Sequence, residues 1–225
     1  QEVVEVGPGK GYLTEFLIKK KPSRLILIEK DRQLETVLTN LIKNKSIKIK
    51  LIIEDALKIS INKLSKNKIV LIGNLPYNVA TTLILNWLRY IHSFESIVVM
   101  VQKEVASRLS AKEKTKHYGR TSVLAQVVAD VKIKFDVAPE NFFPKPKVHS
   151  SVIEIIPKEK IKFNYKKLDK FLKLSFMHKR KTLKNNLSKI SSNIEEKIYK
   201  CGVNPALRPE EISPNQFIKL SEELI

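Results

Sequence analysis

The chain has 225 residues, of which 43% are hydrophobic, so it can bury one substantial core and a small second domain. It has no run of eighteen apolar residues, which excludes a membrane-spanning helix, and its single cysteine, Cys201, excludes an intramolecular disulfide. The formal charge is +19, from 42 Lys and Arg against 23 Asp and Glu, which indicates a polyanionic partner. No Cys/His cluster has zinc-ligand spacing, and we expect a cytoplasmic protein without a metal.

Up to Pro157, short β-branched runs alternate with segments of helical periodicity, a pattern typical of an α/β fold with a mainly parallel sheet. The predicted strands are residues 3–6, 25–28, 47–53, 69–72, 97–101, 131–137 and 148–156. The predicted helices are residues 12–20, 32–42, 81–91, 103–109 and 121–129. Because the first strand begins almost at Gln1, we expect that a preceding segment of the protein is missing from this sequence.

Three glycines follow the first strand in EVGPGKG (residues 5–11) and lead into a helix. Such a loop lets the backbone approach a nucleotide-like cofactor at the carboxyl edge of the sheet, although tight turns also use glycine without binding a ligand. Glu29 lies 22 residues after Gly7, at the end of the second strand. It is placed to accept hydrogen bonds from both ribose hydroxyls of an adenosine, and the alternative is an ordinary strand-end charge.

A further acid follows the third strand, in Glu54-Asp55-Ala56. Asp55 is placed to accept a hydrogen bond from the adenine amine of a bound adenosine, which favours a methyltransferase cofactor over a dinucleotide. The alternative is that Asp55 caps a short helix at Ala56.

The sequence Asn74-Leu75-Pro76-Tyr77-Asn78 follows the fourth strand and combines an amide, a carbonyl and an aromatic face. Pro76 lacks an N–H and fixes its own φ, so the Leu75 carbonyl is biased away from helical pairing and can point into a pocket. The Asn74 amide oxygen and this carbonyl can hold the amine of a flat base, with Tyr77 against its face. The alternative is a simple turn after a strand.

After Pro157 the strands stop, and a polar basic bridge leads to a block of predicted helices. These are residues 167–177, 181–190, 194–201 and 214–224. Gly202 is suited to end the third of them, and Ser213-Pro214 to begin the last. Residues 158–200 hold 14 Lys or Arg against 4 Asp or Glu, a net charge of +10. A Lys-rich genome explains part of this excess but not its clustering, so a basic helical domain that contacts nucleic-acid phosphates is predicted.

Taken together, the motifs resemble those of the KsgA-type small-subunit ribosomal RNA adenine dimethyltransferases. The resemblance covers nearly the whole chain. It rests on EVGPGKGYLT (5–14), IEKD (28–31), EDAL (54–57), GNLPYN (73–78), VQKEVASRL (101–109), YGRTSVLAQ (118–126), FFPKPKVHSSV (142–152), FMHKRKTLKNNL (176–187) and RPEEISPNQF (208–217). It implies a Rossmann-like class I methyltransferase fold with a mainly parallel sheet, over residues 1–157, plus a small all-helical, RNA-binding domain over residues 158–225.

The resemblance also implies an activity: dimethylation, by S-adenosylmethionine, of the exocyclic amines of two adjacent adenosines near the 3′ end of small-subunit (16S) rRNA. The product of the cofactor is S-adenosylhomocysteine. The implied partner is small-subunit rRNA or an immature 30S subunit, and the protein is expected to act as a monomer in ribosome biogenesis. Members of this family carry, before the first strand, a basic segment with a Gln-Asn-Phe-Leu-type motif that contacts the cofactor, and this sequence lacks it.

Residue roles carry over position by position. The cofactor-binding residues are Gly7, Glu29, Asp55 and Asn74. The catalytic residues are Asn74, Leu75, Pro76, Tyr77 and Phe142. Phe142 is chosen because Phe-x-Pro-x-Pro-x-Val then ends at Val148, and Phe143 is the alternative stacking residue. The RNA-binding residues, taken from the basic cluster, are Lys179, Arg180, Lys181 and Lys184.

Three other functions stay open. An Erm-type enzyme methylates large-subunit rRNA with nearly the same methyltransferase motifs, but segments 176–187 and 208–217 match the small-subunit enzymes better. A non-catalytic ribosome-assembly or RNA-binding protein on the same fold is disfavoured by the intact Asn74, Pro76 and Tyr77. A DNA adenine methyltransferase would use the same chemistry, and only a substrate test separates it.

Overall fold

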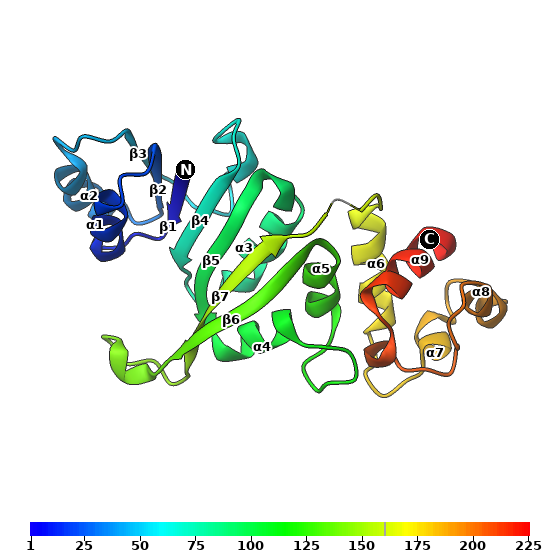
Figure 1. Ribbon diagram of the computed structural model, residues 1–225. Coiled ribbons are helices and arrows are strands. Elements are labelled where there is room, and N and C mark those ends of the chain that lie inside the picture. The colour runs from blue at the N-terminus through cyan, green and yellow to red at the C-terminus, as the bar shows by residue number, and fades with distance from the viewer. Residues whose placement is uncertain (160) are drawn as a thin grey trace. The chain divides into compact units, whose positions relative to one another are not determined.

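The computed structural model describes residues 1–159 and 161–225 (Figure 1). Its strands form one seven-stranded sheet in the order β3-β2-β1-β4-β5-β7-β6. They are β1 Glu2–Val6, β2 Arg24–Glu29, β3 Ile49–Ile53, β4 Ile69–Asn74, β5 Phe94–Gln102, β6 Ala129–Val137 and β7 Ser150–Pro157. Pairing is parallel from β3 through β5, and β7 runs antiparallel to β5. The predicted α/β fold with a mainly parallel sheet is confirmed.

All predicted helices are present within the described residues. They are α1 Tyr12–Lys19, α2 Glu35–Ile42, α3 Ala80–Leu88, α4 Lys103–Ser110, α5 Arg120–Val128, α6 Tyr165–Ser175, α7 Leu183–Leu187, α8 Ile194–Lys200 and α9 Pro214–Leu224. Gly202 follows α8 with φ +77°, and Ser213 begins α9 by accepting a hydrogen bond from the Gln216 N–H, as predicted. None of the helices in the described part of the chain is long and apolar enough to cross a membrane. Lys160, in the predicted basic bridge, lies outside the described residues.

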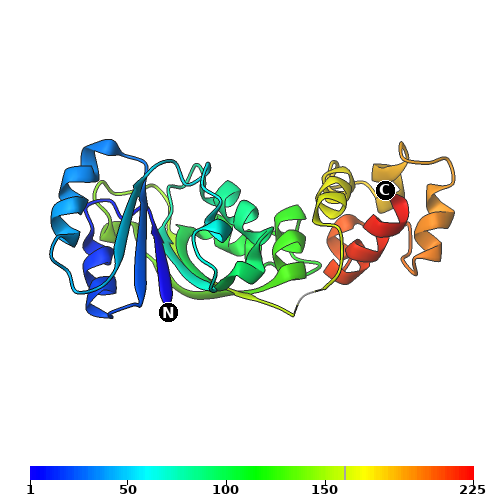
Figure 2. The ribbon, with the colours of Figure 1, turned by 90° about the horizontal axis from the view of Figure 1, so that it is seen from above.

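The sheet is buried on both faces at its centre, which explains why its strands are nearly continuous apolar runs. On one face, Val3, Leu25 and Leu27 are buried against side chains of α1 and α2, including Leu17 and Ile42. Figure 2 shows α1 and α2 on this side of the sheet and α3 on the other. Burial therefore keeps the central strands mostly apolar, and the predicted cofactor residues Gly7, Glu29 and Asn74 lie where those strands end.

Contacts divide the chain into two compact units. The first unit comprises residues 1–106 and 131–157, and the second comprises residues 107–130 and 158–225. Both this division and the predicted one have a break after Pro157, but residues 107–130, which contain α5, group with the C-terminal helices because α5 packs against α6 and α9. The assignment of functional domains to residues 1–157 and 158–225 stays a prediction.

Aromatic rings and a partly buried ion pair hold the second unit together. Phe217 of α9 lies edge-on to Phe171 of α6, with ring centroids 6.3 Å apart, and 5.5 Å from Phe176. The Arg120 guanidinium donates to the Asp169 carboxylate from Nε and Nη2, at 2.7 and 2.6 Å. Since Asp169 is buried, this pair links α5 to α6 through charge-assisted hydrogen bonds.

We predict that Gly73→Ala destabilises the protein while Gly119→Ala does not. A Cβ on Gly73 would lie 2.7 Å from the Val6 carbonyl oxygen, a backbone atom in the neighbouring strand that cannot move aside, whereas a Cβ on Gly119 would meet nothing within 4 Å. Crowding of this kind costs about 1 to 3 kcal/mol. Denaturant unfolding of both variants measures the difference, and equal free energies of unfolding would contradict the close approach of β1 and β4.

Candidate active site and basic surface

Gly7 follows β1 and lies beside the ends of β2 and β4. Its φ is +71°, a conformation that other residues rarely adopt, and its N–H donates to the Ile28 carbonyl oxygen at 2.9 Å. A Cβ at this position would lie 3.4 Å from the backbone oxygen of Asn74. The loop after β1 therefore passes close to the ends of both β2 and β4, and glycine leaves room for another group to approach.

The Glu29 carboxylate is almost completely buried and organises this loop. Its Oε2 accepts from the Gly9 N–H at 3.1 Å, and its Oε1 accepts from the N–H groups of Lys30 and Asp31 at 2.8 and 2.9 Å. An ionised carboxylate offers about four acceptor positions, so three backbone bonds leave capacity for a hydroxyl donor. Glu29 thus holds the glycine loop in place and still lines the neighbouring cavity.

Asp55 forms an ion pair with Lys30, in which Nζ and Oδ2 are 2.9 Å apart, and its Oδ1 accepts from the Leu57 N–H at 3.0 Å. The hydrogen bond from Lys30, with a smaller contribution from the Leu57 N–H, lowers the pKa of the Asp55 carboxyl. Residues 56–58 form a turn and not a helix. The alternative in which Asp55 caps a helix at Ala56 is therefore wrong, although its side chain does bond to the following turn.

A cavity of about 270 Å³ brings the predicted cofactor residues Gly7, Glu29 and Asp55 together. Asn74 does not line it, but lines an adjoining cavity of about 340 Å³. Pro76 lines both cavities, so the two lie side by side in the first unit. This arrangement suits a reaction between two bound molecules that meet near the end of β4.

The second cavity contains every residue predicted to be catalytic. Its lining consists of Asn74, Leu75, Pro76, Tyr77, Phe142, Phe143, Pro144 and Pro146. Leu75 is buried and its N–H donates to the Met100 carbonyl oxygen at 3.1 Å, which fixes the backbone that carries its own carbonyl. Phe142 is half-buried and Phe143 is fully exposed, so the Phe142 ring is the better held of the two.

Two buried polar groups near the predicted site residues were not among the predictions. Glu5 in β1 is buried, and its Oε2 accepts from the Thr14 hydroxyl at 2.7 Å. The pKa of the Glu5 carboxyl is raised to about 7, mainly by burial, which the Thr14 hydrogen bond opposes and the negative charge of Glu29 reinforces. Ser150 is the other group, and its hydroxyl lies 2.6 Å from that of Tyr77.

The predicted RNA-binding residues lie in the second unit. Lys179, Arg180 and Lys181 are exposed in the loop between α6 and α7, since α7 is shorter than the predicted helix over residues 181–190. The first residues of the predicted helix belong instead to this loop, which the buried Asn186 side chain holds in place. Its Oδ1 accepts from the His178 N–H, and its Nδ2 donates to the carbonyls of residues 178, 181 and 182. Lys184 differs, because its ammonium pairs with Glu195 at 3.0 Å.

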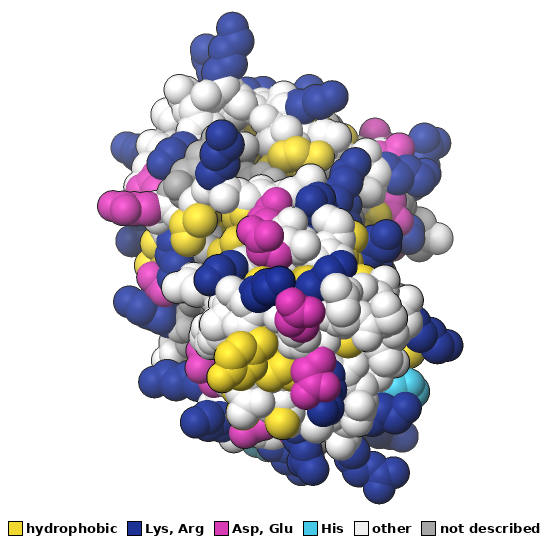
Figure 3. Space-filling model, turned by 90° about the vertical axis from the view of Figure 1, so that its right-hand side faces the viewer, with side chains coloured by type: hydrophobic (Ala, Val, Ile, Leu, Met, Phe, Trp, Pro, Cys, Tyr) yellow, Lys and Arg dark blue, Asp and Glu magenta, His cyan; other side chains and the backbone are white. Residues whose placement is uncertain are grey.

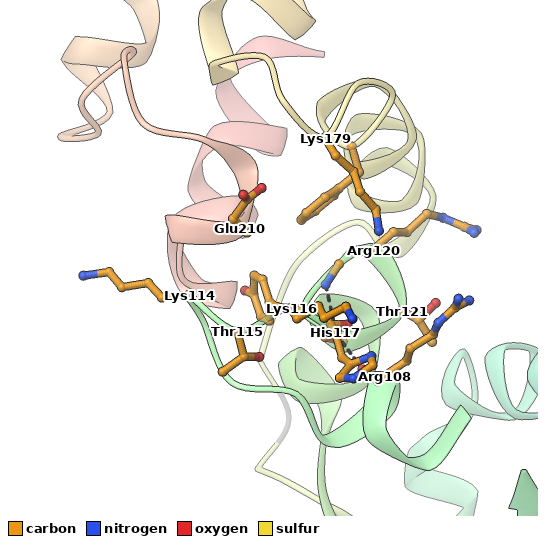
Figure 4. Close-up of a pocket in the computed structure, with 13 residues that line it drawn as sticks. Arg108, Lys114, Thr115, Lys116, His117, Arg120, Thr121, Lys179 and Glu210 are labelled. Carbon is orange, nitrogen blue, oxygen red and sulfur yellow. Dashed lines mark hydrogen bonds between the residues drawn. The ribbon is translucent and has the colours of Figure 1, made fainter. Parts of the chain in front are cut away.

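Lys179 also lines a basic cavity of about 460 Å³ in the second unit. Its other cations come from residues 107–130: Arg108, Lys114, Lys116 and Arg120, with His117 beside them. Figure 4 shows Lys179 and Glu210 on the side of the cavity opposite Arg108. Figure 3 shows Lys and Arg side chains around most of the outline of the face it presents.

These four cations were not predicted as functional, because their segment reads as part of the α/β block. The only sequence signal for them is that they lie in or beside the motifs VQKEVASRL and YGRTSVLAQ. Among residues 1–159 and 161–225, no three His, Cys, Asp or Glu side chains are grouped so as to hold a metal ion.

Comparison with known proteins gives consistent results. The family model described as ribosomal RNA adenine dimethylase matches residues 1–225. Ribosomal RNA small subunit methyltransferase A of Ehrlichia ruminantium is 41% identical over 97% of this chain and 84% of its own length. The protein of the same name from Pelagibacter ubique is 39% identical over 99% of this chain and 86% of its own length.

Two solved structures share the fold. A dimethyladenosine transferase from Plasmodium falciparum superposes with a TM-score of 0.80 at 24% identity, over 97% of this chain and 88% of that one. The 23S rRNA methyltransferase ErmE superposes with a TM-score of 0.72 at 20% identity, over 99% of this chain and 90% of that one. At such identities the superpositions establish a class I methyltransferase fold.

We predict that Glu5→Gln removes a pH dependence of stability. Because the pKa of Glu5 rises from an ordinary 4.5 to about 7 on folding, the folded protein holds a proton that the unfolded chain releases, and the free energy of unfolding falls as the pH rises through this window. The variant should therefore gain roughly 2 to 3 kcal/mol over the parent between about pH 5 and about pH 8. Urea unfolding at both pH values tests this, and a constant difference would mean that Glu5 is ionised in the fold.

Proposed function

The chain belongs to the ribosomal RNA adenine dimethylase family, and from this premise we propose that it dimethylates the exocyclic amines of two adjacent adenosines near the 3′ end of small-subunit rRNA. The family resemblance predicted from the sequence motifs is confirmed. The observation that carries the proposal is the pair of adjoining cavities that share Pro76. One has the acids and glycine of a cofactor site, and the other has the acceptors and rings of a base site.

S-adenosylmethionine is the methyl donor that a class I methyltransferase of this family uses. The residues present fit it: Gly7 keeps the loop open, and Glu29 retains acceptor capacity for ribose hydroxyls. Asp55 offers an acceptor on the same cavity for the adenine amine. When bound, S-adenosylmethionine supplies an electrophilic methyl group on its sulfonium. We assign Gly7, Glu29 and Asp55 to its binding, together with Asn74, which lines the adjoining base cavity.

The base site addresses a chemical difficulty. The exocyclic nitrogen of adenine is a poor nucleophile, because its lone pair is delocalised into the ring. The Asn74 amide oxygen and the Leu75 carbonyl oxygen would accept hydrogen bonds from the amine, favouring a pyramidal nitrogen whose lone pair points at the methyl group. Once the amine is so held, the site needs no strong base before methyl transfer.

The aromatic residues hold the base in the cavity. A target adenine must leave its stack to enter such a site, and a ring against its face offsets part of that cost. Tyr77 and Phe142 line the cavity together and are assigned to this stacking, which contributes about 1 to 3 kcal/mol per base in comparable sites. Phe143 also lines the cavity, but it is fully exposed and less constrained.

The RNA backbone is assigned to the second unit. Lys179, Arg180 and Lys181 project from the loop after α6, and Lys184 follows on α7. The basic cavity beside Lys179 supports this assignment, because five Lys or Arg side chains and one acidic side chain, Glu210, are among the residues that line it, although Arg120 also pairs with Asp169. We propose that residues 1–157 carry the methyltransferase site and residues 158–225 the principal RNA contacts, in a monomer acting on an immature 30S subunit in the cytoplasm.

The other functions are less well supported. Identity of about 40% to small-subunit methyltransferases extends over nearly the whole chain, whereas ErmE, at 20%, shares only the fold. A complete base cavity argues against a non-catalytic assembly protein. To separate these functions, the protein is mixed with labelled S-adenosylmethionine and unmethylated small or large subunits, or DNA, and the modified base is located. Label in two adjacent adenines of small-subunit rRNA is expected, and label only in large-subunit rRNA or DNA would refute the proposal.

We expect Asn74→Ala to lower methyl transfer about a hundredfold and to leave RNA affinity nearly unchanged, because the substitution removes an acceptor needed in the transition state and no phosphate contact. Single-turnover rates and filter binding measure the two quantities. Asn40→Ala, an exposed change in α2 that lines neither cavity, is the matched control. A loss of less than about threefold for Asn74→Ala would contradict its assigned role.

Replacing Lys179, Arg180 and Lys181 together with Gln should weaken RNA binding and flatten its salt dependence. Each lost phosphate contact lowers the slope of log K against log salt by about 0.7 to 0.9. Lys184→Gln is the comparison, and because its ammonium already pairs with Glu195 we expect a smaller change. A triple variant with the parent's slope would place the RNA surface elsewhere.

A further inference from the structure

The hydroxyl group of Tyr77 is fixed by a residue outside the base cavity. Its oxygen lies 2.6 Å from Oγ of Ser150, a hydrogen bond in which either hydroxyl can donate. Ser150 is fully buried, whereas Tyr77 is half-buried with its ring on the cavity. A tyrosine ring turns about two side-chain torsions, and a bond at its far end restrains both of them.

Ser150 is itself held by the sheet. It is the first residue of β7 and pairs with Gln102 at the end of β5. Two residues earlier in β5, the Met100 carbonyl oxygen accepts the Leu75 N–H. The end of β5 therefore anchors both the backbone that presents the Leu75 carbonyl and, through Ser150, the ring of Tyr77.

Ser150 also lies a few residues after the segment that forms the other aromatic side of the cavity. Phe142, Pro144 and Pro146 line the cavity, and the chain enters β7 four residues after Pro146. Ser150 thus stands where the segment that carries Phe142 joins the sheet. One buried hydroxyl ties the Tyr77 ring to the strand that begins directly after the Phe142 segment.

We infer that Ser150 is a positioning residue that sets the plane of the Tyr77 ring, and with it the width of the slot between Tyr77 and Phe142 that receives the target base. The inference rests on the proposed function for the identity of the base. Ser150 touches neither base nor cofactor, and acts only through Tyr77. A slot of fixed width holds the adenine amine in line with the acceptors at Asn74 and Leu75, so loss of the bond should slow transfer more than it weakens RNA binding.

The neighbouring Ser151 provides a matched control. It is also fully buried, but successive strand residues face opposite sides of a sheet, and its Oγ donates to Oδ1 of Asp136 at 2.7 Å. Ser151→Ala removes a buried hydroxyl of the same strand with no contact to Tyr77. Any loss that reflects damage to β7 alone should appear in both serine variants.

The experiment compares Ser150→Ala, Tyr77→Phe, the double variant and Ser151→Ala in methyl transfer. The two single variants at the pair should each lower kcat about fivefold with KM for RNA within about twofold, as for one hydrogen bond lost from an oriented site. The double variant should be no worse than either single one, since both remove the same bond. Ser151→Ala should keep the parent's kcat.

A second measurement does not depend on methyl transfer. With 2-aminopurine in place of the target adenine, its fluorescence reports how the flipped base stacks, and Ser150→Ala and Tyr77→Phe should both raise it above the parent complex. The inference is overturned if Ser150→Ala lowers Tm but leaves kcat and this fluorescence unchanged, or if the losses of the single variants multiply in the double one. Failure of the parent to methylate small-subunit rRNA would count against the proposed function, while the fluorescence would still decide the role of Ser150.

Discussion

Parallel pairing of β1 with β2 and with β4 holds three strand ends level at one edge of the sheet. Val6 stands opposite Ile28 on one side and Gly73 on the other. The next residues along the three strands therefore emerge together at this edge: Gly7, Glu29 and Asn74. Gly7 and Glu29 line one cavity and Asn74 lines the other, so the site depends on register, and a one-residue slip in either pair would turn a functional side chain to the other face.

This dependence explains how much of the molecule the sequence predicts. Buried strands must be apolar and must end in polar residues, so apolar runs locate the sheet, and the acids and glycines after them locate its functional edge. The conformation of residues 74–77 can also be predicted from the sequence, because the missing N–H and fixed φ of Pro76 act on its immediate neighbours. What is determined within four or five residues, or by burial alone, could be predicted from the chain.

The rest depends on contacts between distant residues. The partnership of Tyr77 with Ser150 spans 73 positions and exists only because β7 returns antiparallel beside β5. That α7 is shorter than the predicted helix depends on the hydrogen bonds from Asn186 to the preceding loop, and helical periodicity in the sequence does not predict those bonds. The grouping of residues 107–130 with the C-terminal helices follows from the packing of α5, whose apolar surface looks like that of any α/β helix.

The anchoring of Leu75 has an evolutionary consequence. Its N–H is bonded to Met100, and the group proposed to act in catalysis is its carbonyl, which every amino acid possesses. No codon change at this position can delete that acceptor, whereas the partner acceptor at Asn74 is a side chain that a single base change can remove. Half of the acceptor pair is thus shielded from mutation and the other half is not. Selection that preserves the contact with the amine should therefore restrict substitutions at Asn74, and at Pro76, which orients the carbonyl, more than at Leu75.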